Sequence, residues 1–312
     1  VATAFSLPFI RRGKSDPVPA ISVLLLLFAG GMTLKLMWAE VPDTAFVKWD
    51  YAYKNIVIAS MVPFILRGRV ELEAFVWTVV LSGMAHCLSF GPKVLLDGGS
   101  FYGAAKGFAP SSFGYGESST LSMLSVSLIP LCLFLTKHSV IIPMGKGIRA
   151  LLYAFVAIAV LTSLGTFART GLVSLLVLGG AMFFTTKRKI LYSMLATVAA
   201  VVAIGFMGAT WQDRMATSTD GNEGSAQGRV AVWLWTLDYV SSHPFGGSFD
   251  VYKINHFELP LPNGNILTIN AKAFHSIYFQ VLGELGIPGA LMFAALIIIA
   301  MASLMKVRKI AR

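Results

Sequence analysis

The chain has 312 residues, of which 56% are hydrophobic and 13% charged, and its formal net charge is +10. Soluble domains carry about 25% charged residues, so this composition excludes an ordinary soluble protein and indicates a membrane protein. Because backbone amides that face lipid must be satisfied within their own segment, we expect an all-α fold, a polytopic bundle of transmembrane helices.

Apolar runs of about 18 or more residues predict helices that can cross roughly 30 Å of hydrocarbon. The opening stretch, VATAFSLPFI, is typical of the end of such a run, so we expect further helices upstream. Hydropathy then predicts eight crossings, and the segment at 52–66, which is short and contains Pro63, is compatible with a tilted or re-entrant helix. The crossings are residues 18–38, 52–66, 70–90, 119–136, 147–166, 170–186, 190–208 and 288–306.

Lysines and arginines lie in short clusters between the apolar runs, and eight crossings place every cluster on one face of the membrane. This is the positive-inside pattern of a membrane protein, and it excludes a nucleic-acid partner as the reason for the net charge. The clusters are Arg11, Arg12 and Lys14; Arg67 and Arg69; Lys137, Lys146 and Arg149; Lys187, Arg188 and Lys189; and Lys306, Arg308, Lys309 and Arg312.

The opposite face receives loops at 39–51, 91–118 and 167–170 and one large insertion at 209–287. We therefore divide the chain into transmembrane helices over 1–208, a periplasmic loop over 209–287, and a last crossing with a basic cytoplasmic end over 288–312. Loops of this length are usually functional or disordered. Within it, RVAVWLWTLDYVSSHP predicts a helix that stops at His243, before Pro244, so the loop is partly a folded cap.

The last apolar segment is preceded by AKAFHSIYFQVLGELGIPG. An unbroken helix from residue 275 to residue 306 would span about 47 Å, more than one crossing needs. Gly283, Gly286, Pro288 and Gly289 therefore predict a break, with an interfacial helix over 272–285 before the final crossing.

On that interfacial helix, Ser276, Gln280 and Glu284 are spaced four apart and would line one face, with His275 beside it. One interpretation is a polar face turned to water. The other places His275 in a pocket at the membrane surface as a general base, because the unperturbed pKa of histidine, near 6.5, suits that role.

Three arginines are candidates for an anion site on the face opposite the basic clusters. Arg229 follows GSAQG, and with Ser225 as N-cap it would open a helix whose free N–H groups favour phosphate; it could equally face solvent. Arg169 lies in GTFARTGLVSLL between two apolar runs, where an ionisable residue is a functional candidate or a side chain reaching for headgroups. Arg214, beside Asp213, is an interface anchor or an accessory cation.

Several motifs are absent from the sequence, including G-x-x-x-x-G-K-[ST], G-x-G-x-x-G, H-E-x-x-H and D-x-D. Nucleotide hydrolysis and metal-dependent transfer are therefore poorly supported, and we expect no metal and no cofactor. Cys87 and Cys132 fall within separate apolar runs and are expected to be packing residues. Arginines and a histidine beside the lipid boundary suit a substrate that has a diphosphate headgroup and a lipid tail.

The segment GRVAVWLWTLDYVSSHPFGGSFD followed by AFHSIYFQVLGELGIPG resembles the C-terminal signature of the O-antigen ligase superfamily. Within it, ARTGLVSLLVLGG, WQDRMAT, EGSAQGR and the region from VKWDYAYKNIV to LRGRVELEAFVWTVVLS are similar to the exosortase-A-associated O-glycosylation ligases. The resemblance covers roughly residues 40–305. It implies a GT-C-type glycosyltransferase of the inner membrane that takes a glycan from undecaprenyl diphosphate at the periplasmic face.

The same resemblance implies roles for particular residues: Arg169 and Arg229 would bind the diphosphate, and His275 would deprotonate the acceptor hydroxyl. The acceptor would be a protein or a lipid. Other side chains expected to contact substrate are Arg214, Glu284, Tyr278 and Gln280.

Two other functions remain open at this point. An O-antigen or exopolysaccharide polymerase would join glycan to glycan with similar residues. A flippase for lipid-linked glycans is a third possibility, although transporters commonly show paired repeats and broken helices at mid-membrane, whereas here the polar residues gather at one edge. The stretch SFGYGESSTLS departs from the Asn-rich version expected in the family, which leaves the role of Glu117 open.

Overall fold

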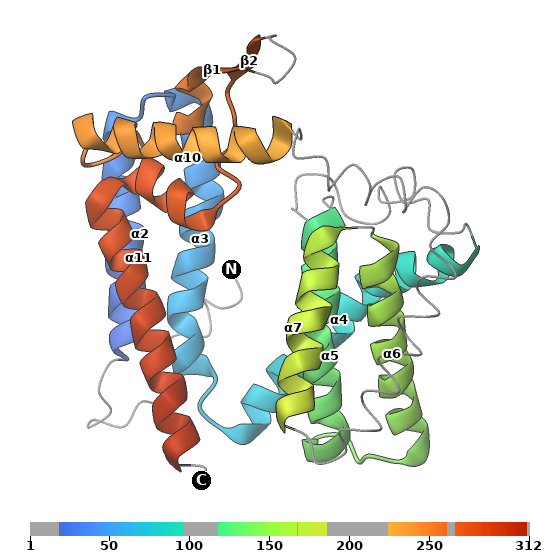
Figure 1. Cartoon of the computed structure of the whole chain (residues 1–312). Helices are drawn as coiled ribbons and strands as arrows, with labels where there is room; N and C mark the ends of the chain where they lie inside the picture. Colours follow the sequence, from blue (N-terminus) through green and yellow to red (C-terminus); the bar gives the residue numbers. More distant parts are fainter. Residues whose placement is uncertain (1–18, 97–117, 167, 186–223, 261–265, 311–312) are drawn as a thin grey trace, which may run out of the picture. The chain divides into compact units, whose positions relative to one another are not determined.

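The structure, a computed structural model, describes residues 19–96, 118–166, 168–185, 224–260 and 266–310 (Figure 1). Five segments within the described helices are long and apolar enough to cross a membrane. They are Ala20–Trp38, Arg69–Gly91, Ser119–His138, Lys146–Gly165 and Ile277–Val307. The prediction of an all-α polytopic membrane protein is therefore confirmed.

The chain folds as two compact units, one formed by Val1–Arg67 with Asp220–Arg312 and the other by Gly68–Thr219. The elements of the first unit are α2 (Ala20–Lys35), η2 (Leu36–Trp38), α3 (Pro42–Ile65), α10 (Gly224–Ser242), η4 (Val251–Ile254), β1 (His256–Pro260), β2 (Ile266–Asn270) and α11 (Ile277–Ile310). Those of the second unit are α4 (Arg69–Leu96), α5 (Ser118–His138), α6 (Lys146–Gly165) and α7 (Arg169–Thr185).

Most predicted crossings coincide with helices, but the segment at 52–66 does not begin where we expected. It is the second part of α3, which starts at Pro42 and makes the predicted loop wrong over residues 42–51. Pro42 suits the first turn of a helix because its missing N–H would have no partner there, and Asp43 adds favourable charge. The segment at 170–186 forms α7, which is shorter than a standard crossing, and 190–208 lies outside the described residues.

The second unit is held by an apolar core between α4, α5 and α6. Trp77, Met84 and Leu128 belong to it together with Cys87 and Cys132, which are buried and unpaired. The prediction that the two cysteines are packing residues is confirmed. At one end of this unit, the carboxylate of Glu73 accepts hydrogen bonds from the backbone N–H groups of Val140 and Ile141, which ties α4 to the connection between α5 and α6.

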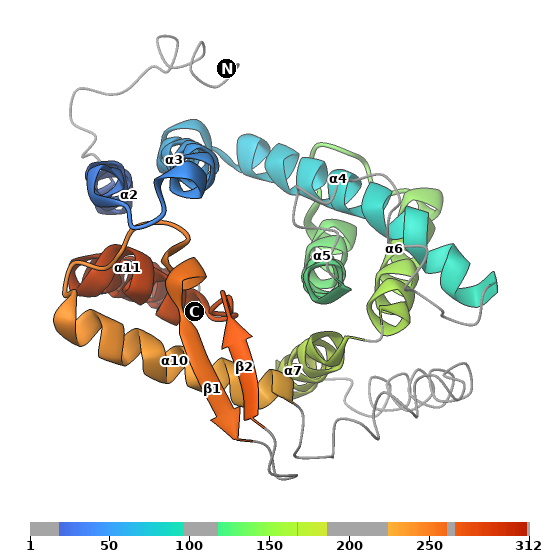
Figure 2. The same ribbon diagram turned by 90° about the horizontal axis from the view of Figure 1, so that it is seen from above.

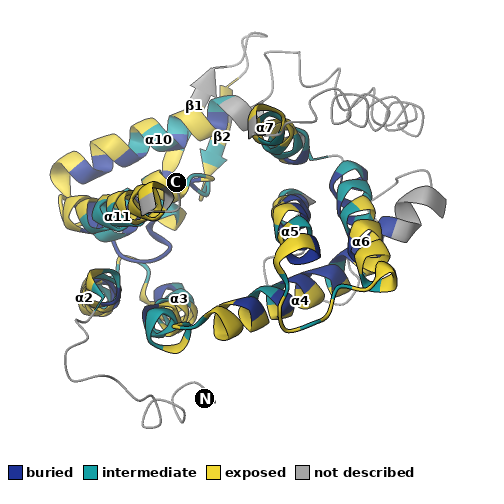
Figure 3. Cartoon of the chain, turned by 90° about the horizontal axis from the view of Figure 1, so that it is seen from below, coloured by how far each residue is buried: buried dark blue, intermediate teal, exposed yellow. Residues whose placement is uncertain are grey.

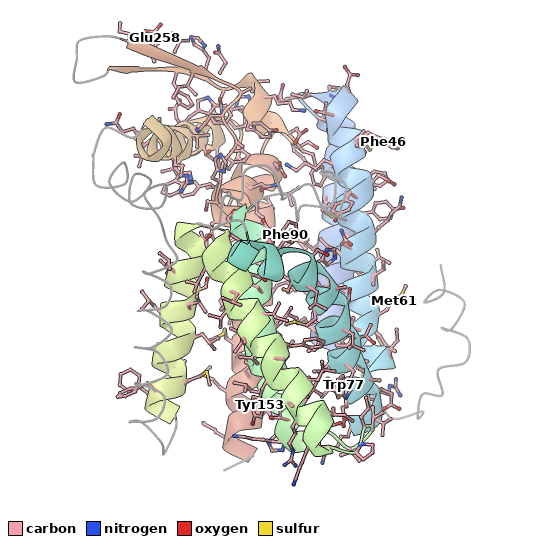
Figure 4. All side chains as sticks on the ribbon, turned by 90° about the vertical axis from the view of Figure 1, so that its right-hand side faces the viewer. Phe46, Met61, Trp77, Phe90, Tyr153 and Glu258 are labelled. Carbon is pink, nitrogen blue, oxygen red and sulfur yellow. The ribbon has the colours of Figure 1, made fainter. Side chains whose placement is uncertain are left out.

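In the first unit, α2, α3 and α11 pack around a second core, and α10 lies across the end of α11 (Figures 1 and 2). The predicted end of α10 before Pro244 is confirmed. Much of the membrane-spanning part of α11 is exposed, as Figure 3 shows, and Leu291 and Ile298 are among its exposed residues. Phe46 is likewise exposed on α3 (Figure 4). Apolar side chains exposed on the membrane-spanning part of α11 face lipid in a membrane protein.

A two-stranded antiparallel hairpin, β1 and β2, follows η4, with His256 opposite Asn270 and Pro260 opposite Ile266. We did not predict these strands. Each has five residues, and the second, ILTIN, does not alternate polar and apolar side chains as a half-buried strand does.

The predicted break in the last helix is confirmed at Gly286, whose φ of 66° and ψ of −165° are non-helical. Only glycine adopts this conformation readily, and a Cβ there would collide with the backbone of Pro244 and Phe245. The N–H of Ile287 donates to the Pro244 carbonyl at 2.8 Å, so the loop after α10 occupies the break. The first part of the helix begins at Ile277 rather than 272, because residues 271–276 are held in another conformation.

Candidate functional site

Residues 271–276, which we call the His275 segment, connect β2 to α11 and are fixed by one buried asparagine. The side chain of Asn255 donates to the carbonyl of Lys272 and accepts from its N–H, both at 2.8 Å. The N–H of Ala271 donates to the carbonyl of Asn255 at 3.1 Å, and Asn255 itself is only 2% exposed. A buried amide that is satisfied on both sides specifies the path of the segment that it binds.

His275 has a φ of 49°, in the left-handed region, and is exposed. Such a conformation costs a residue other than glycine about 1–3 kcal/mol and persists only where the surroundings enforce it. It also changes the predicted arrangement. Ser276, whose carbonyl accepts the N–H of Gln280, precedes the helix, so Ser276 and His275 are not part of the helical face that carries Gln280 and Glu284.

Trp233 on α10 joins that helix to both sides of His275. Its indole N–H donates to the carbonyl of Phe274 at 2.8 Å, and its ring stacks on Phe279 with centroids 5.1 Å apart. Phe274, which is 2% exposed, anchors the segment in the core of this unit. A single tryptophan therefore holds the residue before His275 and the first turn of α11 against α10.

Arg229 lies on α10 four residues before Trp233, so the two side chains are neighbours on one helical face. It is exposed, and it is the sixth residue of a helix that begins at Gly224. The predicted position at the helix start, with Ser225 as N-cap, is therefore wrong, since the N–H groups without helical partners belong to the first four residues. Helical side chains lean toward the N-terminus, which carries the guanidinium in that direction.

Lys272 is a second cation in this region, and it was not among the residues predicted to contact substrate. A Cβ placed on Gly228 would lie 3.6 Å from Lys272 Nζ, so the ammonium group lies beside the residue that precedes Arg229. Lys272 thus lies beside the start of α10 near Arg229, and Trp233 of the same helix contacts the residue before His275. The only signal in the sequence was a lysine three residues before the histidine, which is too common to be informative by itself.

Glu284 is buried, with 3% exposure, and its carboxylate is already engaged. It pairs with Lys48 of α3 at 2.5 Å and accepts the N–H of Asp250 at 3.2 Å. Lys48 also pairs with Asp250 at 3.1 Å, and Lys253 pairs with Asp250 at 2.9 Å. We call these four residues the ion cluster; it binds α3 and η4 to the first part of α11.

The charged groups of the ion cluster shift one another's pKa values. Burial lowers the pKa of Lys48, but the carboxylates of Glu284 and Asp250 outweigh burial and raise that pKa above the ordinary value of lysine. Burial raises the pKa of Asp250, but the ammonium groups of Lys253 and Lys48 outweigh burial and lower it below the ordinary value of aspartic acid. Both residues are therefore charged at neutral pH.

The other candidates on α11 lie in the first part of the helix. Tyr278 is 65% exposed, and its ring meets Phe293 edge to face at 6.2 Å between centroids. A straight helix would separate residues 278 and 293 by about 22 Å, so this contact exists because the helix folds back at Gly286. Gln280 is half-buried.

Arg169 is the first residue of α7, in the other unit, and its side chain lies outside the described residues. The start of α7 is closely packed. A Cβ on Gly171 would collide with the hydroxyl of Ser122 and would lie 2.8 Å from that of Ser163, and these two hydroxyls are themselves 2.9 Å apart. Arg214 and Glu117 lie outside the described residues.

Comparison with known protein families gives two matches. Residues 153–294 match the family described as O-Antigen ligase, and residues 3–140 match a family of unknown function (DUF5935). No curated protein and no solved structure matches the chain.

The first match runs from α6 past the break in α11, so it includes Arg169, Arg229 and His275. This part of the chain is therefore similar to O-antigen ligases, which supports a membrane function of the glycan ligase or polymerase type.

Proposed function

We propose that this protein is a glycosyltransferase of the exosortase-A-associated O-glycosylation ligase type. It would transfer a glycan from undecaprenyl diphosphate to a hydroxyl of a protein or lipid acceptor, at the periplasmic face of the bacterial inner membrane. The O-antigen ligase match and the apolar helices support the general class. The donor, the acceptor and the residue roles are our inferences.

In this proposal, the imidazole of His275 accepts the proton of the acceptor hydroxyl as its oxygen attacks the anomeric carbon of the donor. The bond from that carbon to the diphosphate oxygen breaks, and the electron pair leaves with the undecaprenyl diphosphate. Attack from the face opposite to the leaving group inverts the anomeric centre. General-base catalysis of this kind contributes about 10²- to 10⁴-fold to the rate.

The observation that carries the proposal is the left-handed backbone conformation of His275. The left-handed conformation of His275 is maintained by Asn255 and Trp233, which hold the residues on its N-terminal side. Strain maintained by surrounding contacts is characteristic of functional sites. The chain thus uses buried Asn255 and half-buried Trp233 to fix the backbone that carries His275.

Negative charge develops on the departing diphosphate, and fixed cations can stabilise it without a metal ion. Arg229 and Lys272 lie in the same region as His275 and are our candidates for this task. The family resemblance implies the same task for Arg169, with Arg214 as an accessory cation. Tyr278 and Gln280 remain candidate contacts to substrate, whereas we assign Glu284 to positioning, because its carboxylate is buried against Lys48.

The proposal is tested with purified protein in proteoliposomes that contain an undecaprenyl-diphosphate-linked glycan and one acceptor at a time: a protein, a lipid or a free glycan. His275→Ala should lower transfer by about 10²-fold or more, as loss of a general base does. Arg229→Lys should also lower transfer, because lysine keeps the charge but loses the bidentate fork. His256→Ala, an exposed histidine on β1, is the matched control and should retain activity.

Transfer at the wild-type rate by both His275→Ala and Arg229→Lys would refute these catalytic roles. Growth of the free glycan rather than of the protein or lipid would identify a polymerase. Movement of the donor across the bilayer without any transfer would identify a flippase.

A further inference from the structure

The first unit contains a pocket of about 640 Å³ that the proposed reaction does not use. Its walls are apolar and come from two membrane-spanning helices, with Phe28 and Met32 on α2 and Leu285 and Met292 on α11. The volume falls within the range of about 300–1,000 Å³ that is usual for small-molecule sites. The break at Gly286 creates one side of it, since Pro288 and Gly289 also line the pocket.

The pocket lies at the depth of lipid headgroups. It includes Lys35 and Trp38 at the end of the membrane-spanning segment Ala20–Trp38, and Trp38 is 66% exposed. Tryptophan and lysine at the end of a transmembrane helix mark the boundary between hydrocarbon and water. The pocket walls therefore continue from this boundary toward the hydrocarbon region.

The rim of the pocket carries one charge of each sign. Lys35 supplies an ammonium group, and Glu40, which is exposed, supplies a carboxylate 3.4 Å from the hydroxyl of Tyr239. His243 completes the rim, with its ring stacked on Tyr239 at 4.4 Å between centroids. Apolar walls below one cation and one anion match a lipid chain below a headgroup that itself carries both charges.

We propose that this pocket binds one chain of a zwitterionic phospholipid with an ammonium headgroup. The phosphate would pair with Lys35 and the ammonium with Glu40. A diphosphate headgroup is disfavoured here, because Glu40 would repel its negative charge. The inference does not depend on glycan transfer, because the pocket rim and Arg229 lie near opposite ends of α10. His243, on the rim, directly follows this helix and is 14 residues from Arg229, about 21 Å along the helix axis.

Two adjacent glycines on α2 provide a matched test. A Cβ on Gly30 or on Gly31 would meet no atom within 4 Å, but only Gly31 lines the pocket. Gly31→Leu should fill the pocket without a clash, whereas Gly30→Leu makes the same chemical change beside it. Both replacements raise helix propensity, so neither should weaken α2.

The measurement is native mass spectrometry of protein extracted from bilayers of phosphatidylethanolamine and phosphatidylglycerol. Wild type and Gly30→Leu should each retain one phosphatidylethanolamine that Gly31→Leu loses. Glu40→Gln should lower the preference for phosphatidylethanolamine over phosphatidylglycerol by about fivefold, the effect of one favourable exposed ion pair of about 1 kcal/mol. Lys35→Gln should weaken retention of both lipids.

Equal retention of phosphatidylethanolamine by Gly31→Leu and Gly30→Leu would overturn the proposal, as would equal binding of the two lipids by wild type. If Gly31→Leu does not fold, Met292→Phe fills the pocket from the opposite wall and answers the same question. A polyprenyl diphosphate retained in place of phospholipid would also contradict the inference and would assign the pocket to the donor.

Discussion

Replacing Asn255 with alanine tests whether the His275 segment is held for function. The substitution removes two hydrogen bonds of 2.8 Å to the backbone of Lys272. Each contributes about 0.5–1.5 kcal/mol, so together they contribute about 1–3 kcal/mol. That is similar to the cost of about 1–3 kcal/mol for the left-handed conformation of His275, so without Asn255 the segment can relax. A loss of about 2 kcal/mol would lower the population of the held conformation about 30-fold.

The assay compares glycan transfer and thermal unfolding for Asn255→Ala, Asn255→Asp and Asn55→Ala. We expect Asn255→Ala to lower the transfer rate about 10- to 100-fold. Asn255→Asp keeps one acceptor for the Lys272 N–H but cannot donate to its carbonyl, so it should also impair transfer. Asn55, an exposed asparagine whose side chain donates to the Tyr51 carbonyl in its own helix, is the matched control. Transfer at the wild-type rate by Asn255→Ala would refute the view that the anchor sustains catalysis.

Three further predictions concern the first unit. Lys48→Met should lower the free energy of unfolding by about 3–5 kcal/mol in a denaturant titration, because Glu284 would be left buried without its cation; an unchanged titration would contradict the assigned role of the ion cluster. Asp250, whose pKa is lowered, should contribute stability above about pH 4 that is lost as the pH falls through its folded pKa; unfolding measured from pH 6 down to pH 2 should show this loss in wild type and less of it in Asp250→Asn. Trp233→Phe should cost about 1 kcal/mol, since stacking on Phe279 survives while the bond to Phe274 is lost; calorimetry and the transfer rate together would show whether His275 depends on that bond.

Local features of the sequence determined the membrane class, most of the crossings and the break in the last helix. Hydropathy over a window of one helix length reports a property of the segment itself, so α2, α4, α5 and α6 could be predicted without knowing what they contact. The same holds for Gly286 and Pro288, because glycine frees the backbone and proline restricts it wherever they occur.

Only the tertiary structure decided what surrounds His275. The four-residue spacing of Ser276, Gln280 and Glu284 suggested one polar face, but Glu284 is instead paired with Lys48, 236 residues away in the chain. Asn255 and Lys272 could not be predicted from the sequence. An asparagine or a lysine has the same sequence neighbours whether its side chain is buried, bonded or exposed. Burial, partner and backbone strain arise from contacts between distant segments, and no local pattern encodes them.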